Sequence, residues 1–175
     1  QQQSIWNDTM EKEGEAFTKQ FVAKPGCSEH ETGLAIDLAR AARNIDFIRP
    51  HLPYDGACGR FRALAAKYGF IQRYRAEKTA VTGIACEPWH FRYVGAPHAQ
   101  LIEQNGLCLE EYAAFLREMG PQQCRLAGGR AAQVLYVPCE NGHARLPGGC
   151  VQVSGDNAGG FIATVWQAGA RRCGA

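Results

Sequence analysis

The sequence lacks a long hydrophobic run, a strong net charge and any Cys-x-x-Cys pair. No apolar stretch approaches the roughly 20 residues that a membrane-spanning helix needs, and no charged segment followed by an apolar one marks a secretion signal. Nineteen Lys and Arg against seventeen Asp and Glu leave a net charge of +2, so we expect no nucleic-acid partner. The missing Cys-x-x-Cys spacing excludes the common zinc-ribbon and thioredoxin-like sites.

What the sequence does contain is typical of a globular protein. Hydrophobic residues make up 46% of the 175 residues, so we expect one domain, or one domain with a small appendage. The unusual feature is eight cysteines. Disulfide bonds would indicate export and buried free thiols a reducing compartment, and the composition leaves both open. The cysteines are Cys27, Cys58, Cys86, Cys108, Cys124, Cys139, Cys150 and Cys173.

Charge and glycine are unevenly distributed, and the change falls near Pro121. Residues 122–175 hold five Arg, no Lys, two acidic residues and ten of the twenty Gly, which is typical of short strands and turns. We therefore expect a main domain at 1–121 and a β-hairpin-rich C-terminal subdomain of unknown role at 122–175. In that subdomain, a Cys139–Cys150 disulfide, free thiols, or a structural zinc site that adds His143 and Cys124 are the alternatives.

Hydrophobic spacing predicts helices and strands without a regular strand-helix-strand alternation, which indicates an α+β fold. The loop at 154–160 is rich in Gly, Asp and Asn and predicts a hairpin turn rather than a phosphate-binding loop, because no helix pattern follows it. Helices are expected at 2–20, weakened or ended by Gly14, at 55–68, ended by Gly69, at 97–105 and at 109–119. Strands are expected at 33–38, 70–74, 89–94, 134–137, 150–153 and 161–166.

Two short stretches, SEHETGLAID at 28–37 and EPWHFRYVG at 87–95, place imidazoles and carboxylates in otherwise apolar, extended segments. Burying such groups is costly unless they are paired or bind a cation. His30, Asp37 and His90 are two imidazoles and a carboxylate, the set that a catalytic zinc uses when its fourth position is left for water. Glu87 is then a spare carboxylate that could take a proton from that water.

The spacing differs from that of a His-Glu-x-x-His helix. Pro88 disfavours a helical conformation at Glu87, so Glu87 and His90 are expected in a loop or at the start of a strand. From the residues alone, a scattered His, Asp and His set is a weak signal for a metal, because structural histidines are common. Both interpretations stay open at this point.

The two stretches together resemble the paired signatures of the zinc D-alanyl-D-alanine carboxypeptidases of the VanY type. This family includes the bifunctional VanXY enzymes associated with vancomycin resistance. The resemblance covers about the first two thirds of the chain. It implies a small α+β metalloprotease fold with a central antiparallel sheet flanked by helices. It also implies zinc held by the residues matching His30, Asp37 and His90, with Glu87 as the general base.

The resemblance also implies contacts with substrate. Ser28 matches a position that contacts substrate, and Gln2 matches a Gln that lies five residues after an Arg in the family pattern. That Arg, which stabilises the developing oxyanion and grips substrate, would fall before residue 1. A chain beginning at Gln1 is therefore expected to bind zinc with severely reduced peptidase activity. Trp89 could line the pocket for a small D-amino-acid side chain, although an aromatic residue there is more often part of the core.

The function implied is hydrolysis of the terminal D-Ala-D-Ala bond of peptidoglycan stem peptides or precursors by a monomeric cell-wall hydrolase. The alternatives are a D,D-dipeptidase, an enzyme with both activities, and a non-catalytic module that binds cell-wall peptides. An extracytoplasmic location is expected, with a membrane anchor upstream of Gln1 as one form of it. A cytoplasmic location is the alternative, because the bifunctional relatives are cytoplasmic.

Three further polar residues are assigned to roles outside the chemistry. Arg92 is expected in a structural ion pair on a strand rather than on a substrate carboxylate. His51, in a proline-flanked loop, and His98, in the first turn of a helix, are expected on the solvated surface.

Overall fold

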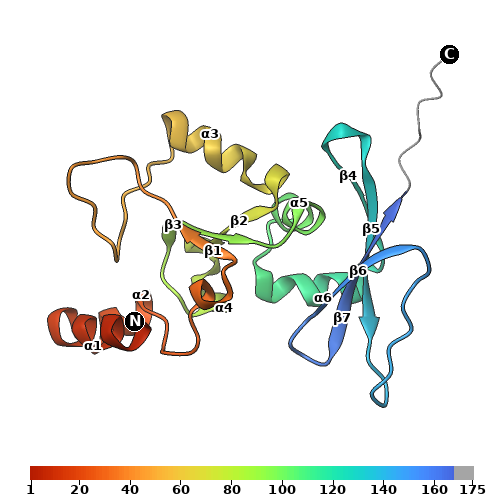
Figure 1. The fold of residues 1–175 in the computed structure, drawn as a ribbon, viewed down its shortest axis with the longest axis horizontal. Helices are drawn as coiled ribbons and strands as arrows, with labels where there is room; N and C mark the ends of the chain where they lie inside the picture. Colours follow the sequence, from red (N-terminus) through yellow and green to blue (C-terminus); the bar gives the residue numbers. More distant parts are fainter. Residues whose placement is uncertain (168–175) are drawn as a thin grey trace. The chain divides into compact units, whose positions relative to one another are not determined.

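The computed structural model describes residues 1–167, which form two compact units, residues 1–95 and the chain from Ala96 onward (Figure 1). This division differs from the boundary expected at Pro121. Helices α5 (Ala96–Gln104) and α6 (Leu109–Met119) pack on the C-terminal sheet, because α6 contacts β5 (Ala131–Pro138) and α5 contacts both β5 and β4 (Gln122–Arg125). Part of the expected subdomain, including Cys173, lies outside the described residues.

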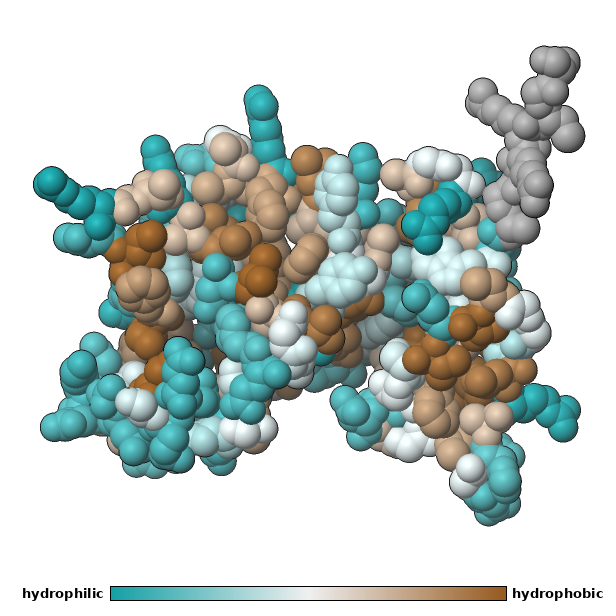
Figure 2. Space-filling view, viewed as in Figure 1, coloured by the Kyte–Doolittle hydropathy of each residue, from teal (hydrophilic) through white to brown (hydrophobic). Residues whose placement is uncertain are grey.

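The first unit begins with two short helices, α1 (Gln2–Glu13) and α2 (Glu15–Phe21). Gly14 separates them with a φ of 86°, a left-handed conformation that L side chains rarely adopt, so the predicted helix with a break at Gly14 is confirmed. The face of α1 seen in Figure 2 is mostly hydrophilic, as its polar sequence predicts.

A three-stranded antiparallel sheet forms the centre of the first unit. Its strands are β1 (Ala35–Asp37), β2 (Phe70–Tyr74) and β3 (Glu87–Tyr93), in the order β1-β3-β2. The mixed α+β architecture with a central antiparallel sheet is therefore confirmed. Because β3 is the middle strand, its side chains are the most enclosed, and Phe91 is 1% exposed.

Helix α3 (Gly56–Ala65) and the 3-10 turn η2 (Ala66–Tyr68) precede β2 and end at Gly69, which has a φ of 90°. This matches the helix and the stop predicted from the sequence. A buried cluster of Leu52, Ala65, Trp89 and Phe91 joins the helix and the sheet. Three short elements complete the unit: η1 (Glu29–Thr32), η3 (Ala76–Lys78) and α4 (Thr79–Thr82).

The second unit is a four-stranded antiparallel sheet in the order β4-β5-β7-β6. Strands β6 (Cys150–Gly155) and β7 (Gly160–Gln167) form the predicted hairpin, and the loop between them holds Asn157 at a φ of 58°. Strand β4 was missed, because its sequence Gln-Gln-Cys-Arg has neither the apolar alternation nor the β-branched residues that mark a strand. A 3-10 turn, η4 (Ala127–Gly129), joins β4 and β5.

His98 was expected on the solvated surface, but it is partly buried. His51 is exposed, as expected. His98 Nδ1 lies 3.0 Å from the Tyr112 hydroxyl and Nε2 lies 3.0 Å from the Thr164 hydroxyl. Burial lowers the pKa of His98 to about 4, so the ring is neutral at pH 7. The first turn of α5 faces the C-terminal sheet, and helical position alone does not reveal that.

The seven cysteines within residues 1–167 are free thiols. Of the alternatives left open for Cys139 and Cys150, the structure therefore shows unpaired thiols. None of the helices in this part of the chain is long and apolar enough to cross a membrane.

Candidate metal centre and pocket

Three side chains from separate elements meet at one point in the first unit. His30 comes from η1, Asp37 from the end of β1 and His90 from β3. His30 Nε2 lies 3.3 Å from Asp37 Oδ2, and His90 Nδ1 lies 3.0 Å from Asp37 Oδ1. One ligand atom from each of the three lies within 4.8 Å of the others, which is close enough for all three to hold one metal ion.

The local fold explains how His30 and Asp37 come together. Gly33 ends η1 with a φ of 71°, which turns the chain from the His30 segment into β1. Asp37 is the last residue of β1 and lies directly opposite His90 in the antiparallel pairing with β3. His30 and Asp37 are close in the sequence, and the pairing of β1 with β3 brings His90 beside them.

The charges in this cluster are strongly coupled. Burial by itself would raise the pKa of Asp37, but hydrogen bonds from His30 and His90 hold it well below its ordinary value. Burial by itself would lower the pKa of His90, but Asp37 and Glu29 raise it to about 9. Without a metal, a pKa raised to about 9 favours a protonated imidazole beside the carboxylates. A divalent cation fits the same place, because two imidazoles and one carboxylate are a known zinc ligand set.

Within residues 1–167, one group of three or more His, Cys, Asp or Glu side chains comes close enough together to hold a metal ion. It consists of His30, Asp37 and His90. The alternative structural zinc site in the C-terminal part, built from Cys124, Cys139, His143 and Cys150, is not assembled.

Glu87 lies beside this cluster as the first residue of β3, where the sequence placed it at a loop or strand entry. Glu87 is 5% exposed, and its Oε2 atom lies 3.7 Å from Nδ1 of His90. Burial raises the pKa of Glu87 to about 8. The positive charge of His90 opposes this rise, and the Asp37 and Glu29 carboxylates add to it.

A pocket opens over the cluster and contains all the residues expected to contact substrate. Ser28 is buried at its wall, and the side-chain nitrogen of Gln2 donates a hydrogen bond to the Ala23 carbonyl at 2.7 Å. Trp89 lines the pocket and also belongs to the core cluster, so the two roles considered for it coexist. The other lining residues are Ile5, Phe21, Val22, Ala23, Glu29, His30, Asp37, Phe47, Ile48, Tyr74, Ile84, Glu87 and His90.

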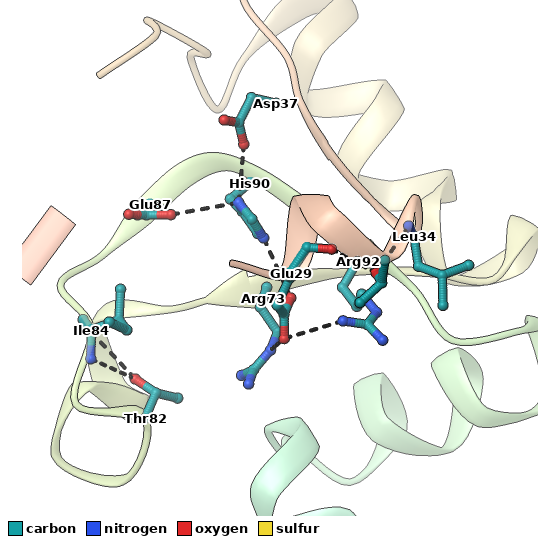
Figure 3. A network of polar contacts seen from close by, with 10 residues as sticks. Glu29, Leu34, Asp37, Arg73, Thr82, Ile84, Glu87, His90 and Arg92 are labelled. Atoms are coloured by element: carbon teal, nitrogen blue, oxygen red, sulfur yellow. Dashed lines mark hydrogen bonds and ion pairs between the residues drawn. The ribbon is translucent and has the colours of Figure 1, made fainter. Parts of the chain in front are cut away.

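Sequence reasoning assigned no role to Glu29 or Arg73, which form a second layer behind His90 (Figure 3). Arg73 Nε donates to Glu29 Oε1 at 2.8 Å, and Arg92 Nη1 lies 3.4 Å from the same oxygen. The predicted structural ion pair of Arg92 is therefore confirmed. Burial by itself would raise the pKa of Glu29, but His90 and Arg73 lower it to about 2. The available signal was the position of Glu29 beside His30.

The chain is similar to known D-Ala-D-Ala peptidases. The family model for VanY, described as D-alanyl-D-alanine carboxypeptidase, matches residues 1–96. The curated protein VanXYC of Enterococcus gallinarum, a bifunctional D-Ala-D-Ala dipeptidase and D-Ala-D-Ala carboxypeptidase, is 46% identical over 119 residues. That match covers 67% of this chain and 63% of VanXYC, so the chain spans less than two thirds of that relative.

Two solved structures are also similar. The vancomycin resistance D,D-dipeptidase VanXYg, in complex with a D-Ala-D-Ala phosphinate analogue, has a TM-score of 0.86 and 43% identity. The match covers 95% of this chain and 68% of VanXYg. The vancomycin resistance D,D-pentapeptidase VanY from a VanB-type cassette, an E175A mutant in complex with Zn(II), has a TM-score of 0.51 and 35% identity. That match covers 63% of this chain and 64% of the pentapeptidase.

Proposed function

The chain belongs to the VanY family of D-alanyl-D-alanine carboxypeptidases, and we propose that it is a zinc-dependent D,D-carboxypeptidase. Its substrate is a peptidoglycan stem peptide or precursor, from which it removes the terminal D-alanine. The observation that carries this proposal is the meeting of His30, Asp37 and His90 beside the buried Glu87 in one pocket. The Zn(II) bound by the VanY pentapeptidase supports the choice of metal.

His30, Asp37 and His90 are the residues that would hold the zinc ion. When bound, zinc polarises the scissile carbonyl and makes a water molecule acidic enough to act as a nucleophile near neutral pH. Glu87 accepts the proton that this water loses on attack and returns it to the nitrogen of the leaving D-alanine, so the proton count balances.

The residues that line the pocket suit the D-Ala-D-Ala end of the proposed substrate. Trp89 presents an apolar surface that fits a methyl side chain, and Ser28 and Gln2 bring hydroxyl and amide groups for polar parts of the backbone. We assign these three residues to substrate binding.

A second candidate is an enzyme that acts on both free D-Ala-D-Ala and the longer peptide. The similarity to VanXYg extends over both units of this chain, whereas that to the VanY pentapeptidase covers fewer of its residues. A non-catalytic peptide-binding module is the weaker alternative, because such a module would have no use for a buried carboxyl beside the three ligands. The extracytoplasmic location and the monomeric state stay predictions.

The experiment is release of D-alanine from a pentapeptide ending in D-Ala-D-Ala and, separately, from the free dipeptide, each with added zinc. Release from the pentapeptide alone supports the carboxypeptidase, and release from both supports the second candidate. His30→Ala is the matched inactive control. Binding of a D-Ala-D-Ala phosphinate analogue without hydrolysis of either peptide would instead favour the binding module.

A further inference from the structure

The two ring nitrogens of His90 face different carboxylates. Nδ1 lies 3.0 Å from Asp37 Oδ1, on the side of the candidate metal ligands. Nε2 lies 3.4 Å from Glu29 Oε2, on the other side of the ring (Figure 3). Glu29 is therefore in contact with a candidate ligand without belonging to the ligand group.

Glu29 is itself held in place by two guanidinium groups. Arg73 on β2 donates from Nε to Glu29 Oε1 at 2.8 Å, and Arg92 Nη1 on β3 lies 3.4 Å from the same oxygen. The side chains of Glu29 and Arg73 are only 16% and 8% exposed. Since both cations engage Oε1, the remaining oxygen Oε2 is directed at His90.

With a metal on the Nδ1 side of His90, this arrangement leaves Glu29 to accept the proton on Nε2. An imidazole binds a metal through a nitrogen without a proton, so the other nitrogen must carry one. A carboxylate at Nε2 accepts that N–H, fixes the ring orientation and leaves the Nδ1 lone pair on the side of Asp37 and His30. Metal-bound histidines in proteins commonly donate their second N–H to a carboxylate in this way.

We propose that Glu29 is a positioning residue that orients His90 for metal binding through Nδ1, with Arg73 and Arg92 fixing the Glu29 carboxylate. The inference rests on the metal site of the proposed function. It assigns Glu29 an effect on metal affinity beyond that of a structural ion pair. A purely structural pair with Arg73 would change the stability of the metal-free protein and leave the zinc affinity of the folded protein unchanged.

The test compares Glu29→Gln with Glu31→Gln, an exposed carboxylate in the same 3-10 turn. Zinc affinity is measured by competition with a chromophoric chelator, at a temperature where the metal-free proteins are folded by circular dichroism. We expect Glu29→Gln to bind zinc about 10- to 100-fold more weakly than the wild type and Glu31→Gln to bind it equally well. A wild-type dissociation constant for zinc in folded Glu29→Gln would overturn the inference while leaving the proposed function intact.

A second variant and a second readout cover the case in which Glu29→Gln fails to fold. Glu29→Asp keeps the negative charge for the two arginines but shortens the side chain, which moves the carboxylate away from His90. It is expected to fold and to bind zinc more weakly. In nitrogen NMR spectra of the zinc-loaded wild type, His90 should carry its proton on Nε2. A proton on Nδ1 would contradict the inference, and a wild type that binds no zinc would overturn the proposed function as well.

Discussion

His90 Nδ1 lies 3.0 Å from Asp37 Oδ1, and the same two residues are direct partners in the antiparallel pairing of β1 with β3. Opposite residues in such a pair have Cβ atoms about 4.5 to 5.5 Å apart, so the backbone alone brings both side chains to one place. A register shift of one residue would turn one strand's side chains to the opposite face. The apolar packing of Phe91 in the core fixes that register, and the core thereby positions the candidate ligands.

Replacing Glu87 separates catalysis from metal binding. Glu87→Gln should bind zinc as the wild type does but release D-alanine about 100- to 10,000-fold more slowly, because the general base is lost. The exposed Glu77 gives a matched control, and Glu77→Gln should keep full turnover. Metal content of the purified variants, measured by atomic emission, checks the assignment. Loss of zinc from Glu87→Gln would make this residue a ligand.

Zinc should stabilise the first unit. A ligand that binds the folded state alone adds about 2.7 kcal/mol at 100 times its dissociation constant. Thermal unfolding with and without zinc should therefore show a melting temperature several degrees higher in its presence, and a chelator should reverse the change. Asp37→Ala should abolish the shift. An equal shift in that variant would place the metal elsewhere.

The second unit should lose stability in mild acid because of His98. Burial lowers the pKa of His98 to about 4 in the folded state, against 6.5 for the ordinary group. His98 therefore binds a proton more readily in the unfolded chain than in the folded one. The contribution of the neutral ring to the free energy of unfolding is complete above pH 6.5 and declines as the pH falls toward 4. The decline is about 3 kcal/mol. Urea unfolding at several pH values measures it.

His98→Gln is the control for that pH dependence. It keeps polar atoms near the Tyr112 and Thr164 hydroxyls but removes the titrating ring. Its unfolding free energy should vary less with pH between 6.5 and 4. A wild-type slope in this variant would assign the effect to another group.

Gly59 should resist substitution by alanine. In an ordinary helix interior, Gly→Ala stabilises by about 1 kcal/mol. In α3, however, a Cβ at Gly59 would clash with the carbonyl oxygen of Tyr54, and backbone atoms there have little freedom to move. Gly59→Ala should therefore destabilise by about 1 to 3 kcal/mol. Gly148→Ala, where a Cβ meets nothing within 4 Å, is the control. Increased stability of Gly59→Ala by chemical denaturation would refute the predicted clash.

The cysteines should titrate as free thiols. Denatured, unreduced protein should react with at least seven equivalents of a thiol reagent, because the seven cysteines in residues 1–167 are unpaired. A lower count that rises after reduction would reveal a disulfide, with Cys139 and Cys150 as the first pair to examine by mass spectrometry.

Much of the local structure was predictable. The break at Gly14, the helix ending at Gly69 and the hairpin of β6 and β7 all follow from glycine conformations and short-range hydrophobic spacing. Strand β4 was not predictable, because its pairing with β5 stabilises a sequence with little strand preference of its own. The division at residue 95 was missed for a related reason, since α5 and α6 are joined to the C-terminal sheet by packing.

The sequence by itself identified the candidate ligands and the candidate base, because His30, Asp37, Glu87 and His90 stand in two motifs whose order and spacing are specific. Only the tertiary structure decided what surrounds them. Glu29 contacts His90 because η1 lies against the sheet. His98 is a partly buried ring with a lowered pKa because α5 turns it toward Thr164 of the C-terminal sheet. Motif chemistry is local along the chain. Burial and contacts between distant residues depend on how the elements pack, and packing sets the pKa of each group.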